Sequence, residues 1–290
     1  MTRADVNKPN DNKHFYRCEL ASVLGCCAPP DLPFAYIGPI ITRPKYRKRG
    51  LAMALFDELM SKMTPGKVLA LHSSGPQTLK YRSTYTPYAA QRSKVCSVAS
   101  ADLVTVVDKT LKSKSPSDYQ HVDCKIFDET KDFDDLLDYD KRTSNRNRSC
   151  EWDLLTQMDS FETFVARDHA STPTGPLRGL MQLQTIGTMF DDTDCMRIGP
   201  LYADDFTIAL QMMKLAGEHM MARQRKPKSE LRYQEHAGNR ELSEFLVDNG
   251  ELFSKITDYD ISSSGPCQLD AGTDSSRIWF ESGNLFTADC

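Results

Sequence analysis

Five cationic side chains are packed into the short segment before a glycine, and an amphipathic run follows at once. The sequence reads RPKYRKRGLA, with the cations at Arg43, Lys45, Arg47, Lys48 and Arg49 and the glycine at Gly50. A helix N-terminus already carries partial positive charge and unpaired amide groups, so cations at that place cost stability. A bound anion would reverse the sign of this interaction. The segment therefore indicates a binding site for an anion.

A pyrophosphate is the anion that this pattern fits best. It needs several N–H donors that converge on one concavity, and a glycine-containing turn at a helix start supplies them with little steric hindrance. Gly50 lets the backbone come close, and Ala52 keeps the first helical turn slim. Arg47, Lys48 and Arg49 would add charge-assisted hydrogen bonds. The alternatives are a solvated basic helix start and a site for nucleic-acid phosphates.

The elements around this segment predict a sheet with helices packed on it. A strand over 34–42 contains Gly38-Pro39, which interrupts a ladder as a bulge does. A helix over 50–63 has apolar residues at helical spacing, and a buried strand over 67–74 follows it. This order of strand, helix and strand implies a mixed, partly parallel sheet and places the chain in the α/β class.

The same order recurs in the second half of the chain. Ile198-Gly199-Pro200 lies in a predicted strand that leads into a long helix over 206–223, as Ile37-Gly38-Pro39 leads into the helix over 50–63. Two copies of one fold would explain this echo. The second junction, however, carries Asp204 and Asp205 in place of the glycine and the cations, and two carboxylates repel a pyrophosphate.

The first half resembles the acyl-CoA-binding region of the GNAT (GCN5-related N-acetyltransferase) superfamily. The residues Arg47 to Ala52 fit its R-x-x-G-x-A loop, with Leu51 inside the motif. The resemblance implies that acetyl-CoA is the co-substrate and that the backbone of Ile40, Ile41 and Thr42 pairs with the donor's pantetheine amides.

The resemblance also implies a role for Tyr81, but with departures from the family pattern. Tyr81 in LKYRSTY stands where a tyrosine commonly protonates the departing thiolate, although Thr84-Tyr85 replaces the usual Gly-Phe. An ordinary packed tyrosine is the alternative. The strand and two helices that usually open the fold have almost no room before Phe15, so we expect either that the first copy is truncated at its N-terminal elements or that the other half completes the site.

The second half resembles the C-terminal GNAT-like domain of tandem acetyltransferases, through FDDLLDYDKRT, RIGPLYADDFTIAL and NRELSEFLVDNGELF. We therefore expect four regions along the chain. They are a flexible N-terminus over 1–14, a GNAT-like acyl-CoA-binding domain over 15–106, a linker over 107–120 and a degenerate GNAT-like domain over 121–290.

Acyl transfer to an amine requires a base that removes the ammonium proton before the nitrogen attacks the thioester. The first half offers no carboxylate on its central strand. Candidates lie in the second half, where each also has a structural alternative as a solvated side chain, a helix cap or an ordinary buried histidine. They are Asp138, Asp140, Asp204, Asp205 and His236.

Composition limits the partners. Up to Asp118 the 18 cationic residues outnumber 9 acidic ones, whereas beyond it 18 face 31. An acidic second half suits a cationic amine acceptor and disfavours nucleic acid. No apolar run reaches the length of a membrane span, and the nine scattered cysteines show neither disulfide framework nor zinc spacing. We expect a cytoplasmic, metal-free transferase.

Two hypotheses follow from these residues. The first is an acyl-CoA-dependent N-acetyltransferase that binds its donor in the first half. The second is a CoA-binding or regulatory module derived from the same fold without turnover, because the usual first elements and a clear base are missing.

Overall fold

A computed structural model describes thirteen stretches of the chain, and all structural statements below concern them. These are residues 2–5, 19–27, 34–62, 68–74, 83, 88–118, 120–145, 147–169, 175–186, 193–226, 228–234, 239–263 and 277–280.

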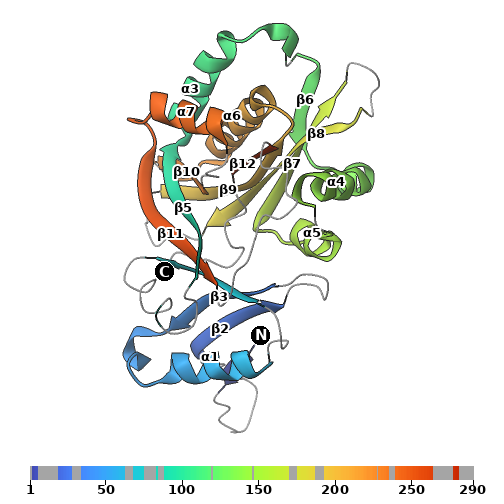
Figure 1. Cartoon of the computed structure of the whole chain (residues 1–290). Coiled ribbons are helices and arrows are strands. Elements are labelled where there is room, and N and C mark those ends of the chain that lie inside the picture. The colour runs from blue at the N-terminus through green and yellow to red at the C-terminus, as the bar shows by residue number, and fades with distance from the viewer. Residues whose placement is uncertain are drawn as a thin grey trace.

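The strands of these stretches form one twelve-stranded mixed sheet (Figure 1). They are β1 (Thr2–Asp5), β2 (Glu19–Cys27), β3 (Phe34–Thr42), β4 (Val68–Ser74), β5 (Tyr88–Ala99), β6 (Val122–Ile126), β7 (Phe161–Asp168), β8 (Leu177–Ile186), β9 (Thr193–Ala203), β10 (Lys228–Gln234), β11 (Ser254–Ser263) and β12 (Ile278–Phe280). The sheet order is β1-β2-β3-β4-β11-β5-β10-β9-β8-β7-β6, with β12 on β9. The α-helices are α1 (Leu51–Lys62), α3 (Ser100–Lys112), α4 (Glu129–Ser144), α5 (Ser149–Thr156), α6 (Phe206–Arg223) and α7 (Arg240–Asp248).

The two halves of the chain exchange strands in the middle of this sheet. β11, from the second half, pairs with β4 on one side and β5 on the other. β5, from the first half, lies between β11 and β10. In Figure 1 these two long strands run side by side from the upper part of the molecule to the lower part. Each half therefore completes the sheet of the other.

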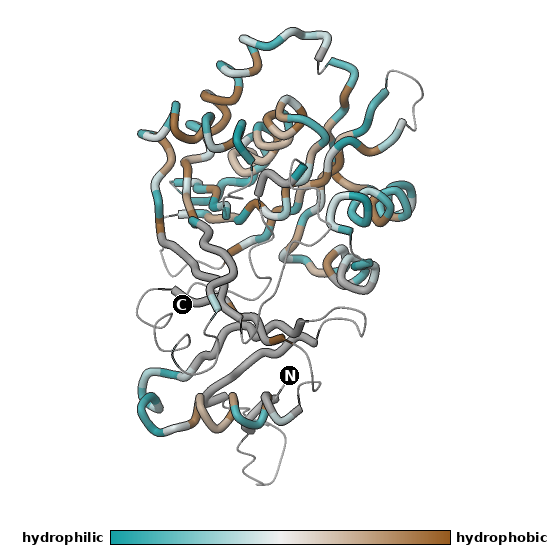
Figure 2. Tube along the Cα trace, viewed as in Figure 1, coloured by the Kyte–Doolittle hydropathy of each residue, from teal (hydrophilic) through white to brown (hydrophobic). Residues whose placement is uncertain are grey.

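Helices cover both faces of the second half. α3, α6 and α7 supply apolar side chains to one core, which contains Leu103, Val107, Ile208 and Leu242. α4 and α5 enclose a second core on the other face, around Trp152. Hydrophobic segments accordingly gather along the inner strands and the facing sides of these helices (Figure 2). In the first half, Leu55, Phe56 and Leu59 of α1 are buried.

The mixed sheet with helices on its faces confirms the predicted α/β class. Two local expectations were wrong. Thr2–Asp5, expected in a flexible end, forms β1 and pairs with β2. Residues 107–112, expected in a linker, complete α3, because Val107 and Leu111 are buried in the core of the second half. The lysines of that segment suggested a polar linker, but they lie on the outer side of an amphipathic helix.

Gly217 sets the distance between α3 and α6. A Cβ at this position would lie 2.7 Å from Cγ2 of Val104 and 3.1 Å from the carbonyl oxygen of Ser100. We predict that Gly217→Leu lowers the free energy of unfolding by roughly 1–3 kcal/mol, because overpacking separates the helices. Glu218→Leu adds the same side chain at the next, exposed position and should change it by less than about 0.5 kcal/mol. Denaturant titrations of both variants measure this, and equal losses would contradict the close approach.

Candidate functional site

A β-bulge in β3 marks the start of the site. In the ladder with β2, Val23 faces Ile40 and Gly25 faces Ile37, so Gly38 and Pro39 together oppose a single residue of the partner strand. Proline has no amide proton and cannot donate to a ladder, which explains why the pattern breaks here. The bulge redirects the last residues of β3 toward the cationic segment.

Beyond this bulge, β3 separates from β4. Their parallel pairing ends at Ile37 and Leu71, although β3 continues to Thr42 and β4 to Ser74. No strand of the described stretches pairs with this edge of β3 over 38–42. The Oγ1 atom of Thr42 is buried there and has no hydrogen-bond partner in the described chain. An extended ligand with amide groups could satisfy both the strand edge and the hydroxyl.

A compact turn joins this edge to α1. Pro44–Tyr46 forms a 3₁₀ turn, and the Arg47 Nε donates to the carbonyl oxygen of Thr42 at 3.1 Å. Lys48 and Gly50 adopt positive φ angles of 60° and 79°. Glycine takes this conformation readily, whereas a lysine is uncommon there. The loop is therefore held in a specific curled shape between the strand and the helix.

The first turn of α1 leaves backbone amides at the site. The amide of Ala54 donates to the carbonyl oxygen of Gly50 at 3.0 Å, which opens the helical ladder. The amides of the three preceding residues therefore lie in the open N-terminal turn. This turn contains no acidic residue, and a Cβ built on Gly50 would have no atom within 4 Å.

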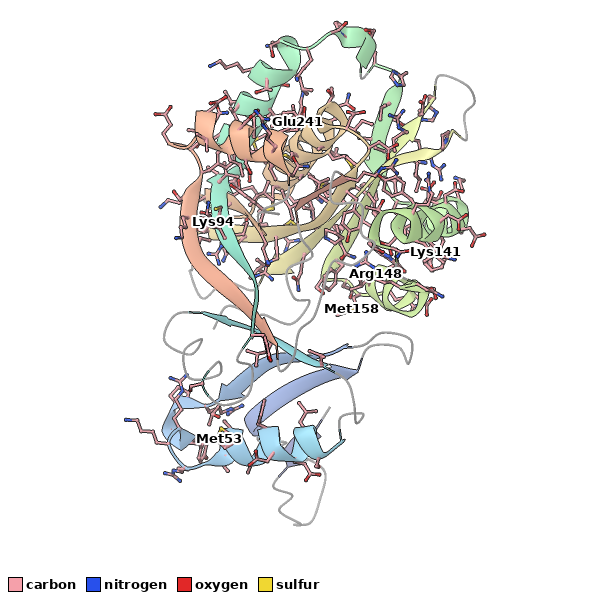
Figure 3. All side chains as sticks on the ribbon, viewed as in Figure 1. Met53, Lys94, Lys141, Arg148, Met158 and Glu241 are labelled. Atoms are coloured by element: carbon pink, nitrogen blue, oxygen red, sulfur yellow. The ribbon has the colours of Figure 1, made fainter. Side chains whose placement is uncertain are left out.

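The cations of the loop remain at the surface around this turn. Arg47, Lys48 and Arg49 are exposed. The Nζ of Lys45 and the Cζ of Arg49 lie 4.9 and 5.6 Å from the ring centroid of Tyr46, which holds both side chains by cation–π contacts. Figure 3 shows the side chains of this region around Met53, at the start of α1. Positive charge and helix amides thus occur together.

The corresponding junction of the second half is closed to an anion. Only Asp204 and Asp205 separate β9 from α6. A carboxylate oxygen of Asp205 accepts from the amide of Ile208 at 3.0 Å and caps the helix. The amide that would hold a phosphate already has an anionic partner, which agrees with the repulsion expected from the sequence.

Asp204 is engaged by several partners. Its Oδ2 accepts from the Nε of Arg178 at 2.6 Å, and its Oδ1 accepts from the hydroxyl of Tyr139 at 3.2 Å and lies 3.4 Å from the Nη1 of Arg277. Burial raises the pKa of Tyr139, and the neighbouring Asp204 raises it further, so this hydroxyl remains a donor. Burial opposes the charge of Arg178, yet its carboxylate partners, Asp204 first, raise the pKa of the guanidinium.

Asp140 is also held by an arginine. It is 1% exposed and accepts from the Nε of Arg148 at 2.9 Å and from its Nη2, while that Nη2 also donates to the hydroxyl of Tyr202 at 3.1 Å. Figure 3 shows Arg148 between α4 and α5. Both carboxylate oxygens of Asp140 thus accept from the guanidinium of Arg148. Asp138, two residues earlier, is exposed.

The structure places the residues expected to bind the donor in one continuous segment, and the candidate bases that it describes in the second half. The residues expected to bind the donor form one continuous strand edge, loop and helix start; they are Ile40, Ile41, Thr42, Arg47, Lys48, Arg49, Gly50, Leu51 and Ala52. Asp140 and Asp204 lie in the second half, among arginines. Tyr81 and His236 lie outside the described residues. Sequence reasoning missed Arg148 and Arg178, because an isolated arginine shows no partner until the fold supplies one.

The described stretches show neither a metal-binding cluster nor a membrane-spanning helix. No cluster of three or more His, Cys, Asp or Glu side chains there could hold a metal ion. None of the helices described is long and apolar enough to cross a bilayer.

Comparison with solved structures shows a GNAT-like fold. A GCN5-related glucosamine N-acetyltransferase region of a fungal multi-domain GH3 β-N-acetylglucosaminidase aligns with a TM-score of 0.56 at 10% identity, covering 84% of this chain and 31% of that one. A tandem GNAT protein from the clavulanic acid biosynthesis pathway aligns with a TM-score of 0.53 at 14% identity, covering 82% and 78%. The predicted GNAT resemblance and the tandem arrangement are confirmed at the level of the fold.

Sequence comparison is less informative. No family model matches the chain. An uncharacterized protein of Caenorhabditis elegans is 23% identical over 182 residues, which are 62% of this chain and 53% of that protein. The chain thus spans about half the length of the curated relative it matches.

We predict that Asp205 acts as a helix cap and not as a base. Asp205→Ala should lower the free energy of unfolding by roughly 0.5–2 kcal/mol, since the first turn of α6 loses an amide partner. Asp205→Asn keeps a side-chain acceptor and should stay close to the parent protein. Thermal and denaturant unfolding of the pair measure this. An asparagine variant as unstable as the alanine variant would contradict the capping role.

Proposed function

We propose that this protein is an acyl-CoA-dependent N-acyltransferase that uses acetyl-CoA as its donor. The observation that carries the proposal is the open edge of β3 over 38–42, continuous with a cation-rich start of α1 that has no acidic residue in its first turn. A strand edge suits the amides of the pantetheine arm, and the helix amides with Arg47, Lys48 and Arg49 suit the pyrophosphate. The fold of the solved neighbours, whose names describe N-acetyltransferases, agrees with this assignment.

The reaction would transfer an acyl group from sulfur to nitrogen. The neutral amine attacks the thioester carbonyl, a C–N bond forms, the C–S bond breaks, and the thiolate of CoA leaves. Tyr81 is our proposed proton donor to that thiolate. Asp138, Asp140, Asp204 and His236 are the proposed candidates for the base, among which the exposed Asp138 has the more accessible carboxylate.

The acceptor that suits the charge of the molecule is a cationic amine. Beyond Asp118 the chain carries 31 acidic residues against 18 cationic ones. Exposed carboxylates such as Asp134 and Asp138 lie on α4, at the surface of the second half. A field of this sign attracts ammonium groups and repels acidic acceptors. We propose that the second half contributes to acceptor binding and that the protein acts in the cytoplasm.

A non-catalytic CoA-binding module is the second candidate. The observation that favours it is that the carboxylates of Asp140 and Asp204 both accept hydrogen bonds from arginine side chains. Such a module would bind the donor through the same edge and loop but would release no thiol with any amine.

Acetyl-CoA should stabilise the protein if the donor site is correct. At about 100 times its dissociation constant, a ligand adds on the order of 2.7 kcal/mol to the free energy of unfolding. Gly50→Leu should abolish this gain, because a side chain at φ 79° is strained and fills the open space above the helix amides. Ser61→Leu adds the same side chain at an exposed position in the last turn of α1 and should retain the gain.

Thermal unfolding with and without acetyl-CoA measures both variants. A full shift in Gly50→Leu, or none in the parent protein, would contradict the assignment of the donor site. The second result would also exclude the non-catalytic CoA module.

Thiol release distinguishes the enzyme from the binder. With a panel of polyamines, amino acids and peptides, we expect CoA thiol to appear with at least one cationic amine. Tyr81→Phe should lower kcat by about tenfold to a hundredfold while leaving the acetyl-CoA shift intact, because general acid catalysis contributes on that order or more. A donor shift without any thiol release would favour the binding module.

A further inference from the structure

The second half contains the same bulge as the first. Met181 faces Leu201 and Leu183 faces Ile198 in the ladder between β8 and β9, so Gly199 and Pro200 together oppose one residue. In the ladder between β2 and β3, Gly38 and Pro39 likewise oppose one residue of the partner strand. Gly199 adopts a φ of 152°, which favours glycine. The two halves therefore share this irregularity at equivalent positions.

The strand on the other side also separates at the equivalent place. The parallel pairing of β9 with β10 ends at Ile198 and Tyr233, as that of β3 with β4 ends at Ile37 and Leu71. In both halves the bulged strand thus leaves its parallel neighbour one residue before the Gly-Pro pair. The residues after the bulge, 40–42 in one half and 201–203 in the other, are structurally equivalent.

The difference is what lies on the two edges. β12 pairs antiparallel with β9, placing Ile278 opposite Tyr202 and Phe280 opposite Leu201. These partners are the equivalents of Ile41 and Ile40, whose edge carries no strand in the described chain. Figure 1 shows β12 as a short segment against β9, within the second half. The chain thus places its own backbone where the first half leaves an open edge.

Two further contacts complete this closure. The Nη1 of Arg277, directly before β12, lies 3.4 Å from the Oδ1 of Asp204. Asp205 caps α6 through the amide of Ile208. In the second half, β12 pairs with the strand edge and Asp205 caps the helix N-terminus. In the first half, the equivalent edge and helix start are the proposed donor site.

From these equivalences we infer that β12 takes the place of an extended donor at the edge of β9 over 201–203, which we call the second slot. Because β12 fills this slot, the protein binds one acyl-CoA per chain. The stoichiometry rests on the proposed function, whereas the filling of the slot does not. The β9 edge accepts an extended peptide segment, and the occupant is this chain's own C-terminal strand, residues 278–280. The first half alone loads the donor.

Hydrogen exchange on two shortened chains tests the filling of the slot. A chain ending at Phe280 keeps β12, whereas a chain ending at Arg277 lacks only that strand and retains the partner of Asp204. We expect the amides of 201–203 that face β12 to exchange roughly tenfold faster in the chain ending at Arg277, since they lose β12 while the pairing with β8 remains. The amides of 193–198, in the part of β9 that pairs with β10, should remain unchanged and serve as the internal control. Equal exchange of 201–203 in both chains would overturn the inference.

A peptide added in trans tests the edge as a strand acceptor. A capped peptide of residues 275–282 should bind the chain ending at Arg277 saturably and restore protection of the amides of 201–203 that face β12. The same peptide with prolines at 278, 279 and 280 should not bind, because it has no amide protons at the three positions that form the strand. Binding of both peptides alike, or of neither, would overturn the inference.

Calorimetric titration with acetyl-CoA tests the stoichiometry. One molecule should bind per full-length chain, and two would overturn the inference. No binding at all would overturn the proposed function and the stoichiometry together. The exchange and peptide results would still decide whether β12 fills the second slot.

Discussion

A strand edge that leaves its neighbour must find another partner for its backbone groups. Buried amide and carbonyl groups are almost always paired, because leaving one unpaired costs free energy. β3 separates from β4 after Ile37, and β9 separates from β10 after Ile198. The functional organisation of this protein follows from how those two edges are satisfied. One is filled by β12, and the other carries no strand among the described residues, which is why we propose it as the donor edge.

The Gly-Pro pair produces this separation in both halves, and the following connection then sets the outcome. In the first half, residues 43–50 form a curled loop that carries cations and ends at Gly50, so that α1 begins with accessible amides. In the second half, two aspartates connect the strand to α6 directly, and one of them caps it. The same backbone device therefore yields a site suited to an anion in one place and a closed junction in the other.

The exchange of β5 and β11 ties the two halves into one sheet. β5 and α3 belong to the first half in sequence but pack with β10 and α6 of the second. A mutation in the buried face of α3 should therefore also change the stability of the second half. Among the described residues, the proposed donor edge and the acidic half are joined through the hydrogen-bonded strands β4, β11 and β5. This suits a reaction in which donor and acceptor must meet at a fixed distance.

Local patterns predicted the elements that define the donor site. The strand over 34–42, the helix that follows Gly50 and the helix over 206–223 could be read from Gly-Pro punctuation and helical spacing. Non-local pairing could not be read. Nothing in the sequence near 254–263 indicates that β11 inserts between β4 and β5. The lysines after Val107 predicted a linker, although α3 continues to Lys112. Arg178, the partner of Asp204, was missed for the same reason, and Arg148 was missed because no local pattern pairs it with Asp140 eight residues earlier.

The most direct test of the central claim is the map of backbone amides that acetyl-CoA protects from hydrogen exchange in the full-length chain. The account predicts protection of residues 40–42 and of the first turn of α1, with no change at 201–203. Protection at 201–203, or protection that spares 40–42 and the start of α1, would contradict it.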